Sequence, residues 1–259
     1  MRGSACIQIN HMNTTTTSDQ TIAQLSAGQR AATRIPLALK LTYTGFMAVL
    51  VPVYWYQYGP TNFLYFCDLA LFFTLAAVWL ENSLLASMAA VGIILPQLLW
   101  CGDFVAHLAG LKLLGMTDYM FDSHRSKFLR GLSCFHGWLP FLLLFLVKRL
   151  GYDRRALPAW TAVAWVSMVI SYCFLPAPGT KLSNPLAPVN VDYVFGLSDA
   201  AAQTWLPGWL WFGLLLVALP VLILLPSHWF LDWFAGRKAT KFPSPNVQPD
   251  GKVQRLSWK

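Results

Sequence analysis

Ionisable residues interrupt three long apolar stretches of this sequence. The first is NFLYFCDLALFF, which begins at Asn62 and carries Cys67 and Asp68. The second ends in CGDFVAHL, where Asp103 and His107 are spaced i, i+4 and therefore share a helix face. An ionisable residue is costly inside a membrane, so it usually serves a function or bridges helices.

The third stretch, CFHGWLPFLLLF, places His136 deep within an apolar segment. A neutral imidazole can take the proton of a thiol, and a carboxylate can orient that imidazole. These residue types predict a catalytic set of His136, Cys67, Asp68 and Asp103. Because a buried imidazole needs partners for both ring nitrogens, we expect one nitrogen of His136 to bond Asp68 or Asp103 and the other to face a cavity.

Six further polar residues are candidates for binding a substrate. They are Asn62, Tyr65, His107, Asn184, Asn190 and Asp192. The last three belong to a loop over residues 176–196, which also contains four prolines. A loop of this length in a compact protein is usually functional or disordered. We predict that it folds back onto the mouth of a polar pocket that opens toward the outer leaflet.

The elements that position these residues must be membrane-spanning helices. The chain is 56% hydrophobic and only 12% charged, whereas a soluble domain has about 25% charged residues. A spanning helix needs about 20 apolar residues. The predicted spans cover residues 37–57, 61–80, 83–107, 128–147, 158–175 and 208–234. The predicted fold is therefore an all-α polytopic bundle, with its transmembrane domain over residues 37–235.

The flanking segments are polar, and their charge predicts the orientation. Residues 1–36 lack the apolar core of a signal peptide and are expected to form a disordered tail, in which Met12 is an alternative start. Residues 236–259 form a basic tail that contains prolines. With both tails in the cytoplasm, thirteen lysines and arginines lie inside and four outside, leaving aside Lys40 and Arg130. This asymmetry predicts cytoplasmic termini for a multi-pass protein of the bacterial inner membrane.

Composition also limits which partners and cofactors we expect. The basic residues flank apolar spans, so the net charge of +8 does not indicate nucleic-acid binding. Membrane lipid is the expected partner. The five cysteines form no CxxC motif, and no HxxxH or HExxH pair is present. We therefore expect neither a cofactor nor a resident metal. Nothing in the pattern predicts an oligomeric state.

The motifs FLYFCDLALFF and FHGWLPFLLLF together resemble the androgen-induced family of six-span intramembrane hydrolases, the YwaF-like bacterial proteins and their acyltransferase relatives. The chain is also similar to a group of bacterial membrane-associated proteins. The first resemblance implies a lipid-ester hydrolase or acyltransferase in which His136 matches the family histidine, two residues before an LPF run. The hydrolase nucleophile is a threonine, but Tyr65 occupies that place, so the resemblance to the acyltransferases makes Cys67 the candidate.

Three other functions compete with an enzyme. In a membrane scaffold, Asp68 would only bridge helices, and Asp103 and His107 would form an interfacial ion pair. In a small transporter, polar residues would line a path through the bilayer. The inner halves of the second, third and fourth predicted spans are almost purely apolar, which argues against such a path. A metal-binding protein would use the histidines and carboxylates as ligands, without a tight spacing to support it.

Overall fold

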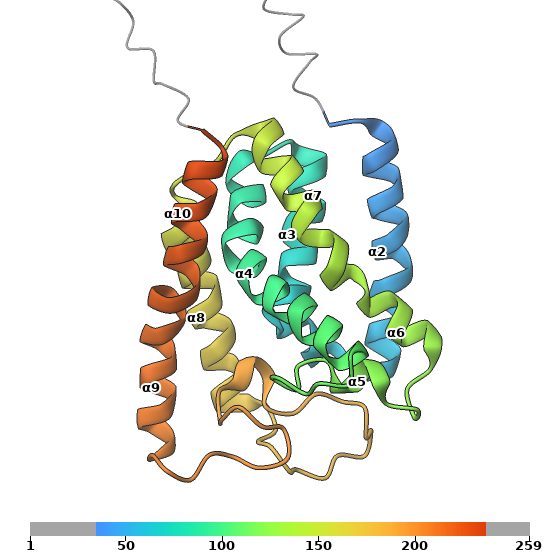
Figure 1. Ribbon diagram of the computed structural model, residues 1–259, viewed down its shortest axis with the longest axis vertical. Coiled ribbons are helices and arrows are strands. Elements are labelled where there is room, and N and C mark those ends of the chain that lie inside the picture. Colours follow the sequence, from blue (N-terminus) through green and yellow to red (C-terminus); the bar gives the residue numbers. More distant parts are fainter. Residues whose placement is uncertain (1–34, 237–259) are drawn as a thin grey trace, which may run out of the picture.

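The computed structural model describes residues 35–236, and within this range every element of regular secondary structure is a helix (Figure 1). The elements in chain order are α2 (Leu37–Tyr58), η1 (Pro60–Leu64), α3 (Phe66–Leu80), α4 (Ser83–Leu108), α5 (Asp118–Phe121), α6 (Lys127–Ser133), α7 (Phe135–Leu150), α8 (Ala156–Phe174), η2 (Val191–Tyr193), α9 (Gly208–Ala218), η3 (Leu219–Leu224) and α10 (Leu225–Phe234). The predicted all-α bundle is confirmed. The predicted tails lie almost wholly outside the described residues.

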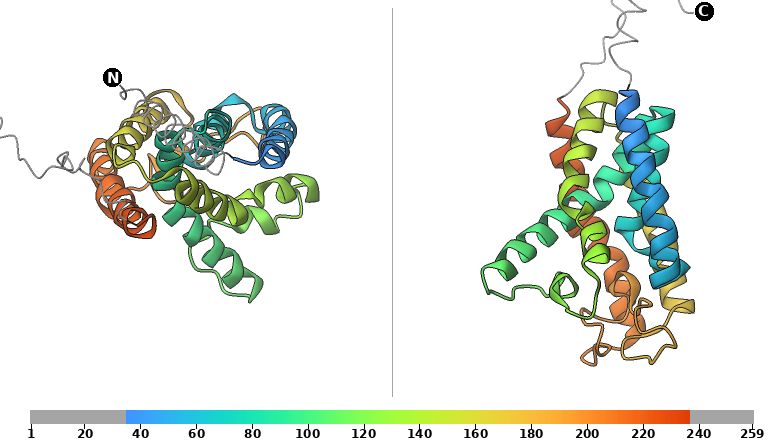
Figure 2. Two further views of the ribbon diagram at one scale, coloured as in Figure 1. Left: turned by 90° about the horizontal axis from the view of Figure 1, so that it is seen from above. Right: turned by 90° about the vertical axis from the view of Figure 1, so that its right-hand side faces the viewer.

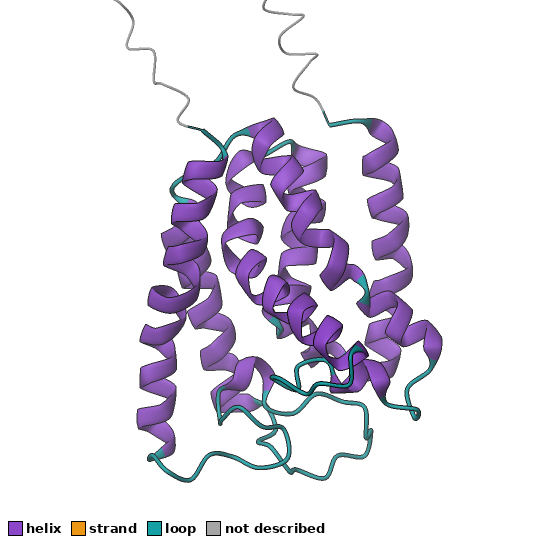
Figure 3. Cartoon of the chain, viewed as in Figure 1, coloured by secondary structure: helices purple, strands orange, loops and turns teal. Residues whose placement is uncertain are grey.

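The long helices run side by side, and the connections gather at the two ends of the bundle. The described chain enters and leaves at the same end, which we call the terminal end (Figure 1). At the opposite loop end, residues 109–126 and 175–207 form the two long connections (Figure 3). Between residues 35 and 236, five helices are long and apolar enough to cross a membrane, so the protein is a multi-pass membrane protein. Which side the terminal end faces stays a prediction.

Helix α4 lies at the centre of the bundle and packs against α3, α7, α8 and α10. Every residue from Ala86 to Ile94 on this helix is buried, and five of the nine are alanine, serine or glycine. Small residues allow helix backbones to approach closely within a membrane. At Gly92 a Cβ atom would lie 2.0 Å from the buried Trp160 ring, so this contact requires glycine.

The outer helices bury only one face. On α2 the buried residues are Tyr43, Met47, Leu50, Tyr54 and Tyr58, at the spacing of a single helical stripe. Helix α9 buries no residue at all, although its sequence is strongly apolar. It continues through the π-helical segment η3, which contains Pro220. A proline removes a backbone donor and often accounts for such an irregularity. These exposed apolar faces are suited to contact lipid.

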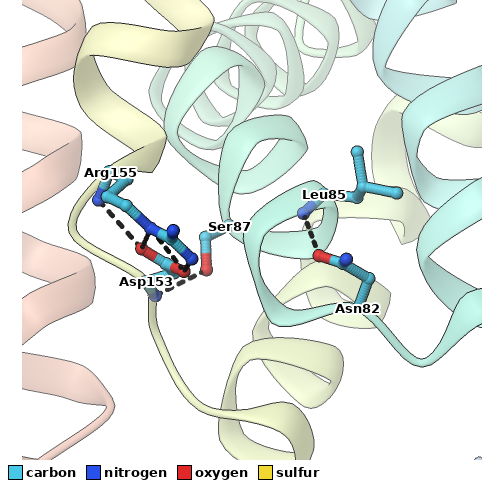
Figure 4. A network of polar contacts seen from close by, with 5 residues as sticks. All are labelled: Asn82, Leu85, Ser87, Asp153 and Arg155. Atoms are coloured by element: carbon cyan, nitrogen blue, oxygen red, sulfur yellow. Dashed lines mark hydrogen bonds and ion pairs between the residues drawn. The ribbon is translucent and has the colours of Figure 1, made fainter.

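Short polar networks hold the helices together at the terminal end (Figure 4). The side chain of Asn82 accepts a hydrogen bond from Leu85 N at 3.1 Å and so caps α4. Asp153 N, in the link between α7 and α8, donates to Ser87 Oγ at 2.9 Å. The guanidinium of Arg155 pairs with the Asp153 carboxylate at 2.7 Å. These bonds fix the depth at which α8 enters the bundle beside α4.

The second predicted span differs from the structure. Residues 61–80 were expected to form one helix, but Tyr65 is extended, with φ −57° and ψ 138°, and separates η1 from α3. The remaining helix has 15 residues and is about 22 Å long, shorter than the roughly 30 Å hydrocarbon core. Helix α3 therefore begins inside the bundle, and its first turn is surrounded by other elements.

Candidate functional site

Asp68 lies in the first turn of α3 and is only 2% exposed. Its Oδ2 accepts a hydrogen bond from Asn62 Nδ2 at 2.6 Å. Its Oδ1 is also buried, and no residue of the described range 35–236 bonds it. A buried polar atom without a partner carries a large desolvation penalty. An incompletely bonded carboxyl group inside a membrane protein is a strong indication of a functional site.

The break before α3 leaves the backbone groups Leu64 O and Phe66 N without partners in a helix, and two side chains from distant segments bond them. Asp192 Oδ1 accepts from Phe66 N at 3.3 Å, and Ser167 Oγ donates to Leu64 O at 2.7 Å. Ser167 Oγ also lies 3.3 Å from Asp192 Oδ2. The single hydroxyl proton of Ser167 serves its shorter bond to Leu64. The Ser167 hydroxyl is therefore shared between two acceptors, and its longer, weaker bond to Asp192 Oδ2 compensates only partly for the burial of that carboxyl group.

The ionisation of Asp192 reflects this burial. Burial raises the pKa of Asp192 to about 8, although the bonds from Phe66 N and Ser167 act in the opposite direction. Asp192 is held on a strained backbone, because Asn190, Asp192 and Tyr193 all have positive φ angles of 52°, 56° and 59°. Asparagine and aspartate tolerate this region, but a tyrosine there is a true outlier. Such strain persists where the surroundings impose it, often at functional sites.

The polar residues of α3, α4 and α8 lie at one depth. Measured along each helix from the terminal end at 1.5 Å per residue, Asp68 is about 18 Å deep, Gln97 about 21 Å and Ser167 about 17 Å. Gln97 is 2% exposed, and neither its Oε1 nor its Nε2 has a bonding partner in the described chain. We call Asn62, Cys67, Asp68, Ser167 and Asp192 the α3 site.

Cys67 lies beside Asp68 on the first turn of α3 and is half-buried. The first N–H groups of a helix have no partner within the helix. Phe66 N donates to Asp192, which brings the Asp192 carboxyl group to the turn that contains Cys67 and Asp68. Tyr65, predicted to bind substrate, is the N-cap residue of α3 and forms the break itself.

His136 lies about 21 Å from the terminal end along α7, close to the depth of Asp68. The hydrogen bond of its imidazole ring differs from the prediction. Nδ1 lies 2.8 Å from the carbonyl oxygen of Ser133, a backbone group three residues away, rather than from a carboxylate. The imidazole stacks on Trp100 and Phe135, with ring centroids 4.8 and 4.1 Å apart. A carbonyl can only accept, so Nδ1 carries the proton and Nε2 has a free lone pair.

The predicted partnership of Asp103 with His136 is also wrong. Asp103 lies about 30 Å along α4 from the terminal end, deeper than the α3 site, and binds the 109–126 loop. It accepts from Leu114 N at 2.7 Å, Thr117 N at 2.9 Å and Thr117 Oγ1 at 2.8 Å. His107 Nδ1 instead lies 3.4 Å from Asp118. We call Asp103 with these partners the Asp103 cap, which has a structural role.

The loop over residues 176–196 folds back onto the bundle, whereas the pocket mouth that it was expected to cover stays a prediction. Asn184 Nδ2 donates to Gln57 O at 2.8 Å, and Asp192 binds the start of α3. Asn190 lies inside the loop, where its amide donates to Gly196 O at 2.9 Å and accepts from Phe195 N at 3.0 Å. Asn184 and Asn190 therefore shape the loop, and Asp192 alone of the three residues joins the α3 site.

The sequence interpretation missed two members of this region, Ser167 and Gln97. Both are polar residues in apolar helices, the same signal that marked Asp68. An uncharged side chain is less costly inside a membrane, so its presence alone indicates a function less strongly. Within residues 35–236 no group of three or more histidine, cysteine, aspartate or glutamate side chains is arranged to hold a metal ion. The α3 site thus offers a thiol and carboxyl groups for acid–base and nucleophilic chemistry.

No protein-family model matches the chain, and neither a curated protein nor a solved structure matches it. The resemblance to intramembrane hydrolases and acyltransferases therefore stays a prediction that depends on the two short motifs.

Proposed function

We propose that the protein is a membrane-embedded enzyme that hydrolyses or transfers the acyl group of a lipid ester. The observation that supports this function is the buried first turn of α3, where Cys67 directly precedes Asp68, whose Oδ1 has no bonding partner within the described residues. The N-terminus of a helix can stabilise a developing oxyanion.

In the proposed reaction, the Cys67 sulfur attacks the ester carbonyl carbon while its proton passes to a nearby base. The tetrahedral oxyanion forms near the N–H groups of Cys67 and Asp68. The carbon–oxygen bond to the alcohol then breaks, and the alcohol takes a proton from Asp192, whose neutral form can act as the acid. Water or a second lipid alcohol finally attacks the thioester and gives its proton to the Asp192 carboxylate, while the departing Cys67 sulfur takes back the proton held by the base. Attack by water gives hydrolysis, and attack by the alcohol gives acyl transfer.

Two groups are candidates for the base. Asp68 Oδ1 is adjacent to Cys67 in the chain and lacks a partner within the described residues. His136 Nε2 has a free lone pair at the same depth, on the neighbouring helix α7. Asp68 is favoured because it belongs to the same helical turn as the thiol. The variants Asp68→Asn and His136→Ala distinguish the two candidates. Whichever residue is the base, its loss should lower turnover by about 10²- to 10⁴-fold.

The decisive measurement uses the purified protein in detergent with fluorogenic acyl esters of short, medium and long chain. We expect Cys67→Ala to abolish turnover and to remove an acyl adduct that intact mass spectrometry detects on the unaltered protein. Cys173→Ala is the matched control, because Cys173 is an exposed free cysteine on α8. Undiminished turnover in folded Cys67→Ala, or no turnover of any ester by the unaltered protein, would overturn the proposal.

A further inference from the structure

A crevice separates α2 from α6 on the side of the molecule, away from the residues of the α3 site. Its volume is about 370 Å³, within the range of small-molecule binding sites. Pro52, Val53, Tyr56 and Gln57 line it from α2, and Ser126, Phe128 and Leu129 line it from α6 and its N-cap.

The contacts of α2 with α6, α7 and the loop before α6 lie on either side of the crevice. Toward the terminal end, Phe46 of α2 packs against Phe135 and Trp138 of α7, with centroids 6.5 and 5.0 Å apart. At the level of the crevice, Tyr54 Oη and Ser133 Oγ form a 2.8 Å hydrogen bond, and at the loop end Arg125 donates to Tyr58 Oη at 3.3 Å. The chain bends at Cys134, between α7 and α6, and α6 turns away from the bundle (Figure 2).

The walls of the crevice are suited to an acyl chain at the level of a lipid headgroup. Phe128 is 58% exposed and Tyr56 83% exposed, and Trp55 beside them is also exposed. Tryptophan and tyrosine are enriched where the hydrocarbon core meets the headgroups. The loop-end mouth of the crevice therefore lies near the membrane interface, with Pro52 and Val53 extending toward the hydrocarbon core.

The mouth also carries positive charge that the described chain does not neutralise. Lys127 is exposed between the lining residues Ser126 and Phe128, and within residues 35–236 it has no ion-pair partner. Arg125, two residues before it, is instead paired with Asp122 at 3.8 Å, and its guanidinium lies over the rings of Tyr58 and Tyr119 at 5.6 and 5.5 Å. A basic side chain beside an apolar groove at the interface complements an anionic phosphate above an acyl chain.

We propose that the α2–α6 crevice binds one anionic phospholipid. One acyl chain lies along Pro52, Val53, Phe128 and Leu129, and the headgroup phosphate binds Lys127, with Gln57 and Ser126 as neutral polar neighbours. This binding does not depend on the proposed enzymatic function. The charge predicts a preference for phosphatidylglycerol over phosphatidylcholine, and the apolar wall predicts that inorganic phosphate alone binds much more weakly.

The test titrates the delipidated full chain in detergent with phosphatidylglycerol, phosphatidylcholine or inorganic phosphate, and counts bound lipids by native mass spectrometry. We expect Lys127→Gln to weaken phosphatidylglycerol binding about fivefold and to leave phosphatidylcholine binding unchanged. Lys112→Gln is the charge-matched control, because Lys112 is an exposed lysine at the same end of the bundle.

A second pair of variants tests the apolar wall. Val53→Trp fills the crevice and should reduce the binding of both phospholipids at least tenfold, whereas Val49→Trp, one turn away on an exposed face of α2, should not. Thermal unfolding in detergent verifies that each variant is folded. Equal affinity for the two phospholipids, unchanged binding in both Lys127→Gln and Val53→Trp, or equal binding of free phosphate would each overturn the proposal.

Discussion

Asp68 and Asp103 are both buried aspartates in the apolar helices of one bundle, at 2% and 3% exposure, yet their surroundings are opposite. Asp103 accepts three hydrogen bonds from the adjoining loop, whereas Asp68 accepts one and keeps a buried oxygen without a partner in residues 35–236. Burial of a charge in a membrane helix therefore does not distinguish structure from function. The number of satisfied hydrogen bonds does, because an incompletely bonded group is available to a ligand or a proton.

The largest expected effect tests the Asp103 cap. Asp103→Ala removes the acceptor of the Leu114 and Thr117 donors, of which Thr117 is buried, and the loss of three hydrogen bonds to a charged acceptor should cost about 4 kcal/mol of stability. Thermal unfolding in detergent measures it. Asp118→Ala is the control, because the Asp118 side chain is 51% exposed and its ion pairs with His107 and Lys112 are weak. A small change in Asp103→Ala would contradict the structural role of this residue.

A second effect, smaller within any one pH unit, concerns Asp192 and pH. Because burial raises its pKa from 3.8 to about 8, the folded protein holds a proton that the unfolded chain releases above pH 4. The stability contributed by this group is therefore full at low pH and is lost as pH rises toward 8, by at most about 1.4 kcal/mol per pH unit. Unfolding measured from pH 5 to 9 should show this decline. Asp192→Asn should flatten it, and an unaltered slope in that variant would assign the decline to another group.

The smallest expected change in stability is that of Asp68→Asn. This substitution keeps the shape of the side chain and removes a carboxyl group that is only partly bonded, so stability should change by less than about 1 kcal/mol, while turnover of acyl esters is lost. The comparison with Asp103→Asn is the informative one. If both substitutions destabilise the protein equally, Asp68 is a structural residue like Asp103, and the distinction between the two regions fails.

The sequence predicted the helices better than the contacts between their polar residues. The ends of α2, α4 and α8 lie within two residues of the predicted spans, because a long apolar segment has only one stable form inside a membrane. His136 was predicted to lie level with Asp68 and Asp103, but a count along the helices places it near Asp68 and not near Asp103. Its hydrogen bond to Ser133 also differs from the prediction, because a nearby backbone carbonyl was as accessible as a distant carboxylate.

By itself the sequence determined that this is a multi-pass α-helical membrane protein with ionisable residues in its spans, because apolar length and composition are local properties. Only the tertiary structure decided that the second span breaks at Tyr65. The backbone groups that this break exposes are bonded by Ser167 and Asp192, which lie 103 and 126 positions away from their partners. A local pattern cannot contain such partners, and they decide which buried aspartate is satisfied and which remains available for chemistry.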